Sequence, residues 1–76
     1  MKEQVFQILC SVMNTSIDNV NIESSSDNIK NWDSLNHMNL ILSLEEEFNI
    51  SFDSDQIIKM TSVKEILSSI KEIQSK

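Results

Sequence analysis

The stretch WDSLNHMNLILSLEEEF, residues 32–48, carries the clearest structural signal in this chain. Its apolar residues recur at the spacing of one helix face: Leu35, Met38, Ile41, Leu42, Leu44 and Phe48. That spacing predicts an amphipathic helix. Asp33 is a good N-cap, because its carboxylate can accept hydrogen bonds from free backbone N–H groups and complements the helix dipole. We therefore predict a helix that begins at Asp33 or Ser34, places the Ser34 hydroxyl at its start, and runs to about Phe48, where Asn49 ends it.

Three other segments have a helical pattern. The first covers roughly residues 2–14, and its apolar face is Val5, Phe6, Leu9, Val12 and Met13. A short helix is expected at about 53–60, where Asp53 and Gln56 resemble a capping box. Ser62 and Glu65 form a second such box, and the last helix follows to about residue 73 with the apolar face Val63, Ile66, Leu67, Ile70 and Ile73. The prediction is an all-α protein, a small four-helix bundle of three main helices and one short helix, in a single domain of residues 1–76.

A long polar segment, residues 15–33, separates the first two main helices. A loop of this length in a small domain is either functional or disordered. Apolar residues recur through it, namely Ile17, Val20, Ile22, Ile29 and Trp32. We therefore expect this loop to be pinned to the core.

The composition excludes several classes of protein. The chain has no glycine and no proline, so it has no Rossmann fingerprint, P-loop or nucleophile elbow. Turns that need a positive φ are expected to use Asn or Asp. At 76 residues the domain has little room for both a core and a deep active site,. A protein that works by being recognised is therefore favoured over an enzyme.

Charge and cysteine content limit the binding partners and the cellular location that we expect for this chain. The net charge of −6 opposes binding to nucleic acid and to anionic membranes and favours contact with basic protein surfaces,. The single cysteine, Cys10, cannot form an internal disulfide, and we interpret it as a half-buried apolar residue without a metal or redox role,. No signal peptide or spanning segment is visible. We expect a cytoplasmic monomer without membrane insertion and without a bound metal.

The order of the motifs resembles that of acyl carrier proteins. The family pattern is Asp-Ser-Leu, an apolar helix, a glutamate cluster with phenylalanine, a short turn, and a Thr-Val step into the last helix. It appears here as Asp33-Ser34-Leu35, Glu45-Glu46-Glu47-Phe48, Ile50 to Phe52, and Thr61-Ser62-Val63. The resemblance implies that Ser34 is the attachment point of a covalent 4′-phosphopantetheine arm, taken from coenzyme A by a phosphopantetheinyl transferase. Acyl groups would ride as thioesters on the thiol of the arm.

The same resemblance implies a surface for partner enzymes. Asp33 is a cap and, by family analogy, a contact for the transferase and its magnesium ion. Acidic residues of the second main helix meet basic patches on partners in this family, which suggests Glu45 and, as the best candidate, Glu46. Asp53 and Asp55 extend the same surface. Leu35 is expected to be a partly exposed contact residue, whereas Met38 is expected to be largely buried. The implied partners are an acyl-loading ligase or acyltransferase and downstream transferases or synthases.

The chain departs from fatty-acid carriers in two places. Those carriers usually have Gly-Ala before the Asp-Ser-Leu motif, where this chain has Asn31 and Trp32, and they carry acids where this chain has Asn36 and Asn39. Complementary charges set partner choice and encounter rate. We therefore favour a carrier of acyl or aminoacyl groups in a specialised biosynthetic pathway over a housekeeping carrier of fatty-acid synthesis.

Two alternatives from other classes remain open. One is an unmodified helical interaction module of the same fold, although such a module has no need of the Ser34 hydroxyl. The other is a small hydrolase in which His37, one turn after Ser34, activates that serine. No oxyanion hole is evident for it, and we prefer to interpret His37 as an exposed polar residue near the arm.

Overall fold

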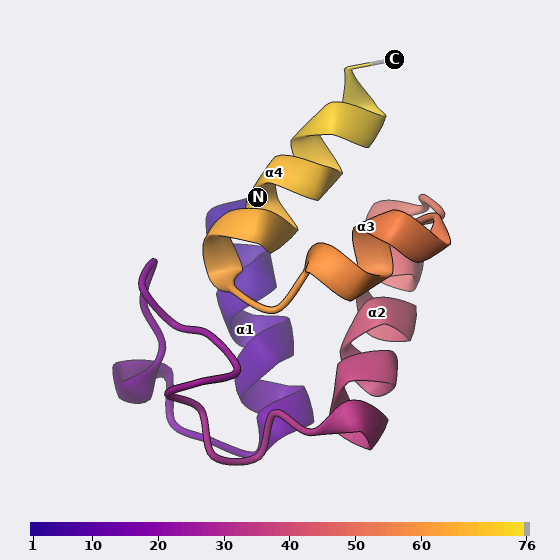
Figure 1. Cartoon of the computed structure of the whole chain (residues 1–76). Coiled ribbons are helices and arrows are strands. Elements are labelled where there is room, and N and C mark those ends of the chain that lie inside the picture. The colour runs from indigo at the N-terminus through magenta and orange to yellow at the C-terminus, as the bar shows by residue number, and fades with distance from the viewer. Residues whose placement is uncertain (76) are drawn as a thin grey trace.

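The computed structural model describes residues 1–75 and places four α-helices in them, α1 (Lys2–Met13), α2 (Ser34–Phe48), α3 (Ser54–Lys59) and α4 (Val63–Gln74). A short 3-10 turn, η1 (Ile17–Asn19), lies in the loop between α1 and α2. Helix α1 packs against both α2 and α4. Figure 1 shows α3 beside α2, and hydrogen bonds place the segment before α3 at Glu45 and the end of α3 at His37 in the first turn of α2. The long loop lies at the opposite end of α4 from the C-terminus. The prediction of three main helices and one short helix is confirmed.

The core lies where the apolar faces of the three long helices meet. Its helical members are Val5, Leu9 and Met13 of α1, Leu40, Ile41 and Leu44 of α2, and Val63, Ile66 and Ile70 of α4. Val20, Ile29, Trp32, Phe52 and Met60 close it from the connecting segments. The faces predicted for the first and last helices are therefore confirmed, with their remaining members packed half-buried at the rim.

Asparagine ends two of the helices, as the absence of glycine led us to expect. Asn14 follows α1 and Asn49 follows α2, each in the left-handed conformation with φ 53°. The amide of Asn14 donates to the carbonyl of Cys10, and that of Asn49 donates to the carbonyl of Glu45. Asparagine tolerates this conformation better than most residues, because its short polar side chain can hydrogen-bond locally.

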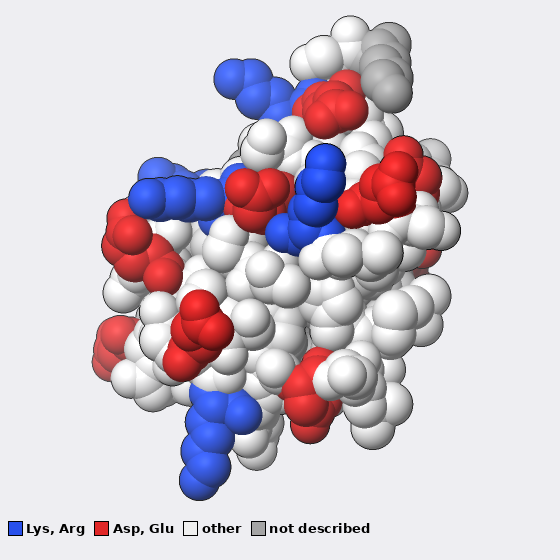
Figure 2. Space-filling model, in the orientation of Figure 1, with Lys and Arg blue, Asp and Glu red and all other residues white. Residues whose placement is uncertain are grey.

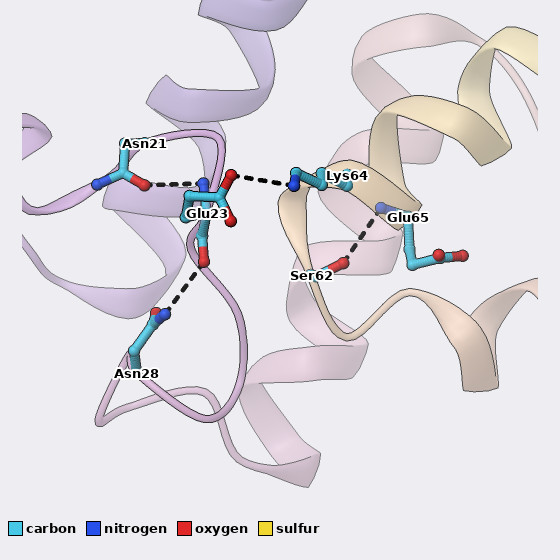
Figure 3. A network of polar contacts seen from close by, with 6 residues as sticks. All are labelled: Asn21, Glu23, Asn28, Ser62, Lys64 and Glu65. Atoms are coloured by element: carbon cyan, nitrogen blue, oxygen red, sulfur yellow. Dashed lines mark hydrogen bonds and ion pairs between the residues drawn. The ribbon is translucent and has the colours of Figure 1, made fainter.

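Of the two predicted capping boxes, one is complete and the other forms only in part. The Asp53–Gln56 box is complete: the Asp53 carboxylate accepts from the Gln56 amide at 2.8 Å, and the Gln56 side chain accepts from the Asp53 amide at 3.0 Å. At α4 the Ser62 hydroxyl accepts from the Glu65 amide at 3.2 Å. The Glu65 carboxylate points away from Ser62, so this box forms on one side only (Figure 3).

Backbone pairing fastens the long loop to the start of α4. The Ser26 amide donates to the Thr61 carbonyl at 2.8 Å, and the Val63 amide donates to the Ser24 carbonyl at 2.9 Å. At the other end of the loop, the Asn31 side chain donates to the Met13 carbonyl at 2.7 Å, which also closes the last turn of α1.

The apolar residues of the loop divide into two groups. Val20, Ile29 and Trp32 are buried, so the expected pinning of the loop to the core is confirmed for them. For Ile17 and Ile22 it is wrong, since both are exposed, Ile17 by 52%. Ile17 opens the 3-10 turn, which the Ser16 hydroxyl caps by accepting from the Asp18 amide, and this turn directs its side chain to solvent.

Candidate functional site

Ser34 is the first residue of α2, and Asp33 holds the helix end around it. The Asp33 carboxylate accepts from the Asn36 amide at 2.9 Å, and its carbonyl accepts from the His37 amide at 2.8 Å. Ser34 itself is exposed. The first N–H groups of a helix have no partner within it, and with the helix dipole they favour an anion at this position. The Ser34 hydroxyl is thus accessible at a point where an attached phosphate would be stabilised by about 0.3–1 kcal/mol.

A groove of about 440 Å³ begins at Ser34 and runs between the start of α2 and the end of α3. Its lining is mostly apolar and comes from three segments: Ser26, Trp32 and Asp33 of the loop, Ser34, His37 and Met38 of α2, and Ile57, Ile58 and Thr61 at and after the end of α3. The groove therefore places an apolar surface directly beside an accessible hydroxyl.

The His37 side chain is half-buried in this groove and is hydrogen-bonded on both sides. Its Nδ1 accepts from the Trp32 indole N–H at 3.0 Å, and its Nε2 lies 2.8 Å from the Ile57 carbonyl oxygen. Neither nitrogen is free to take a proton from Ser34. The expectation of an exposed His37 was wrong, because the short helix α3 covers the ring, a contact that the pattern of α2 alone does not reveal.

The apolar candidates Leu35 and Met38 both reach the surface. Leu35 is 72% exposed, as expected for a contact residue. Met38 was expected to be largely buried, and this is wrong, since it is 45% exposed and lines the groove. The core side of α2 is occupied by Leu40, Ile41 and Leu44, and Met38 falls at the edge of that face.

The acidic candidates differ in what they already bind. Asp53 caps α3, and the Glu45 carboxylate accepts from the Phe52 amide at 2.9 Å, so each has a structural task. Glu46 and Asp55 are exposed and form no hydrogen bond or ion pair with any side chain in residues 1–75. The structure thus brings Asp33, Ser34 and Met38 together at the groove, whereas Glu45 lies at the far end of α2.

Two further apolar residues are exposed. Ile58, which sequence reasoning missed, is 73% exposed and lines the groove. Leu42 was expected on the apolar face of the helix, and this is wrong, since it is 58% exposed on α2. The pair Ile57–Ile58 in a helix of six residues was the available signal for Ile58, because adjacent side chains of a helix point in different directions and Ile57 packs against the core,.

Two negative findings apply to the part of the chain that the structure describes. Within residues 1–75, no group of three or more His, Cys, Asp or Glu residues is placed to hold a metal ion. Over the same residues, none of the helices combines the length and the apolar character needed to cross a membrane.

Comparison with known proteins identifies the class of domain and then the family. Residues 3–70 match the family model described as a phosphopantetheine attachment site. The chain is 30% identical to the acyl carrier protein of Chlorobium phaeobacteroides over 70 residues, which cover 92% of this chain and 90% of that one. It is 31% identical to the acyl carrier protein of Nitratidesulfovibrio vulgaris over 74 residues, 97% of each chain. The chain therefore belongs to the acyl carrier protein family.

A solved structure supports the same assignment. The holo acyl carrier protein of Geobacter metallireducens superimposes with a TM-score of 0.84 at 28% identity, covering 97% of this chain and 85% of that one. The predicted all-α bundle is confirmed as the acyl carrier protein fold. Proteins of this family are carriers and not catalysts, so the hydrolase alternative is excluded, and their prosthetic group is 4′-phosphopantetheine.

Proposed function

We propose that Ser34 carries the 4′-phosphopantetheine arm through a phosphodiester formed from coenzyme A. The observation that supports this proposal is the position of the Ser34 hydroxyl, exposed at the start of α2 and beside an apolar groove. When bound, the arm supplies a thiol on which acyl groups are held as thioesters. The chain itself presents the hydroxyl, holds the helix end through Asp33 and offers free N–H groups to the phosphate,.

The protein then delivers acyl or aminoacyl intermediates to partner enzymes. These are a phosphopantetheinyl transferase, an acyl-loading ligase or acyltransferase, and downstream transferases or synthases. The surface proposed for them surrounds Ser34, continues along α2 and includes the start of α3: Asp33, Leu35, Met38, Glu45, Glu46, Asp53 and Asp55. Asp33, Glu45 and Asp53 have structural hydrogen bonds in addition, and the members free to serve recognition alone are Leu35, Met38, Glu46 and Asp55.

We further propose that the carrier serves a specialised biosynthetic pathway. No charged residue occurs in α2 between its start at Ser34 and Leu44. A basic partner surface finds no counter-charge along this half of the helix, and Leu35, Met38 and Leu42 are exposed there instead. Because charge complementarity sets partner choice, enzymes that require acids at these positions should bind poorly. A housekeeping carrier of fatty-acid synthesis remains the alternative.

Intact mass tests the attachment. The protein is incubated with coenzyme A, magnesium and a broad-specificity phosphopantetheinyl transferase, and one phosphopantetheine increment is expected. Ser34→Ala should abolish it. Ser54→Ala is the matched control, because Asp53-Ser54 repeats the Asp33-Ser34 pair at the start of another helix and its serine is also exposed.

Other outcomes contradict the proposal. An increment that survives in Ser34→Ala, or one that is lost in Ser54→Ala, would assign the arm to another residue. No increment on the folded wild-type protein would favour an unmodified interaction module or a carrier with a dedicated transferase. To separate the two pathway proposals, binding of an enzyme of fatty-acid synthesis to this protein is compared with its binding to its own housekeeping carrier. Poor binding to this protein supports the specialised pathway, and equal binding supports the housekeeping role.

A further inference from the structure

His37 connects three segments that are separate in the sequence. It stands on the first turn of α2, receives a hydrogen bond from Trp32 of the long loop, and contacts the Ile57 carbonyl of α3. The indole and imidazole planes are inclined by only 25°, with centroids 6.3 Å apart, as for rings joined edge to edge by this hydrogen bond. All three residues line the groove beside Ser34.

The two hydrogen bonds define the proton on the ring. A carbonyl oxygen can only accept, so Nε2 must carry the hydrogen that it donates to Ile57. An indole N–H can only donate, so Nδ1 must be unprotonated to accept from Trp32. This contact therefore requires the neutral ring with its hydrogen on Nε2.

Protonation would break one of the two bonds. A hydrogen added at Nδ1 would face the Trp32 N–H across 3.0 Å, donor against donor. Trp32 is only 7% exposed, so water cannot easily replace the lost acceptor,. The Nε2–H bond to Ile57 would remain, which means that protonation acts first on Trp32 and on the loop that carries it.

Helix α3 depends on few other attachments to α2. It has six residues, and none of them is buried. Among residues 1–75, the side chains of α2 hold this segment by hydrogen bonds at two points, His37 at the Ile57 carbonyl and Glu45 at the Phe52 amide that precedes the helix. The first of these is the point nearest Ser34.

We propose that His37 is a positioning residue that holds the end of α3 and the Trp32 indole against the start of α2, and thereby sets the shape of the groove beside Ser34. The contact itself is independent of the proposed function, whereas its effect on loading rests on Ser34 being the attachment site. The bond to Trp32 requires the neutral ring, whereas the bond to Ile57 requires only the hydrogen on Nε2,.

The surrounding charges do not replace the two hydrogen bonds. The charged residues on the elements that meet at His37 are Asp18, Glu23, Asp27, Lys30 and Asp33 on the loop, Glu45, Glu46 and Glu47 on α2, and Asp53, Asp55 and Lys59 at α3. Of these, Asp33 lines the same groove. None of them forms a hydrogen bond or ion pair with the imidazole in the part of the chain that the structure describes.

Fluorescence of Trp32 tests the contact directly, because the chain has one tryptophan. Indole emission responds to hydrogen bonding and to the polarity around the ring. The wild-type emission should differ from that of His37→Phe, which fills the site but cannot accept from the indole N–H. His37→Gln keeps one donor and one acceptor, so its emission should lie close to that of the wild type. Far-UV circular dichroism on the same samples shows whether the protein remains folded.

A second measurement links the contact to loading. His37→Phe fills the site but has neither hydrogen bond, and we expect KM of the phosphopantetheinyl transferase for it to rise about fivefold, the equivalent of one lost hydrogen bond. His37→Gln should restore KM to within about twofold of wild type at neutral pH.

Each result decides the proposal. Identical emission from the wild type and a folded His37→Phe would overturn it. So would imidazole ¹⁵N shifts that place the hydrogen on Nδ1. If His37→Phe does not fold, the imidazole ¹⁵N shifts of the wild type still decide. The difference in emission between His37 and Phe at this position should persist in a Ser34→Ala background, so that failure of the attachment proposal alone leaves this one standing.

Discussion

The carboxylate of Glu45 accepts a hydrogen bond from the backbone amide of Phe52 at 2.9 Å. The carbonyl of Glu45 also accepts from the amides of Asn49 and Ile50, so one residue organises the whole turn that leaves α2. The three consecutive glutamates are therefore not equivalent. Glu45 is half-buried beneath the turn, whereas Glu46 and Glu47 are exposed.

Replacement of these glutamates should separate a structural role from a surface role. Glu45→Ala leaves the Phe52 amide without its charged acceptor and should lower the free energy of unfolding by about 1–2 kcal/mol. Glu46→Ala should change it by less than about 0.5 kcal/mol. Urea denaturation followed by circular dichroism measures both. Equal losses in the two variants would contradict the assignment of Glu45 to the turn.

Asn49 should tolerate glycine but not alanine. Its left-handed conformation, with φ 53°, costs a residue with a Cβ roughly 1–2 kcal/mol, and asparagine recovers part of this,. Asn49→Ala should lower Tm by about 4–8 °C for each kcal/mol lost. Asn49→Gly should leave Tm within about 2 °C of wild type, because glycine adopts this conformation without strain. A glycine variant as unstable as the alanine variant would show that the side chain has another task.

Local signals explain how much of the fold the sequence predicts. Asp33 and Asp53 cap the helices expected of them, and the apolar spacing identifies the buried faces of the first and last helices, because both depend on residues within one or two turns,. The face predicted for α2 was wrong in part, since Met38 and Leu42 are exposed and Leu40, which it left out, is buried. The position of Ser34 at the start of α2 follows from the same local rule. Its role as an attachment site came from the resemblance and stays a prediction.

The errors concern contacts between segments. The exposure of Met38 and the burial of His37 depend on where α3 lies, and its six residues carry no pattern that fixes this placement. The task of Glu45 depends on the turn that brings Phe52 back over α2. Ile17 looked like an anchor by composition, but the 3-10 turn directs it outwards.

The ion pair between Glu23 and Lys64 should contribute little to stability. Its N···O distance is 3.0 Å, but the two side chains are 71% and 60% exposed (Figure 3). Pairs of this kind contribute about 0.2–1 kcal/mol and are screened by salt. Lys64→Ala should therefore shift the free energy of unfolding by less than about 0.5 kcal/mol.

The buried hydroxyl of Ser24 at the same junction provides the contrast. Ser24 is buried, and its hydroxyl accepts from the Asn21 amide at 2.9 Å while its carbonyl accepts from Val63. Ser24→Ala should cost about 1–2 kcal/mol, measured in the same urea titration. A larger loss for Lys64→Ala than for Ser24→Ala would mean that the ion pair holds the loop.

Cys10 should react slowly with alkylating reagents. It is half-buried, and this burial raises the pKa of its thiol above the ordinary value, an effect that a hydrogen bond to its backbone opposes only in part. Because the thiolate is the reactive form, iodoacetamide at pH 7 should label the thiol of an attached arm well before Cys10. The rate at Cys10 should rise with pH beyond pH 8. Mass spectrometry of the modified and unmodified protein measures both rates, and Cys10→Ser identifies the slower site; equal rates would count against a protected Cys10.

Salt should raise the melting temperature of this acidic protein. The net charge of −6 creates self-repulsion, although Figure 2 shows basic side chains lying beside several of the acidic ones on the face it presents,. Screening weakens the repulsion as the Debye length falls from about 30 Å at 0.01 M to about 8 Å at 0.15 M salt.

The double variant Glu46→Gln/Asp55→Asn removes two negative charges without removing any hydrogen bond of the fold, which brings the net charge from −6 to −4. Its Tm should be higher than that of wild type at low salt and less sensitive to added NaCl, as measured by calorimetry across a salt series. A wild-type Tm that stays constant across the series would show that the neighbouring basic side chains already offset the repulsion.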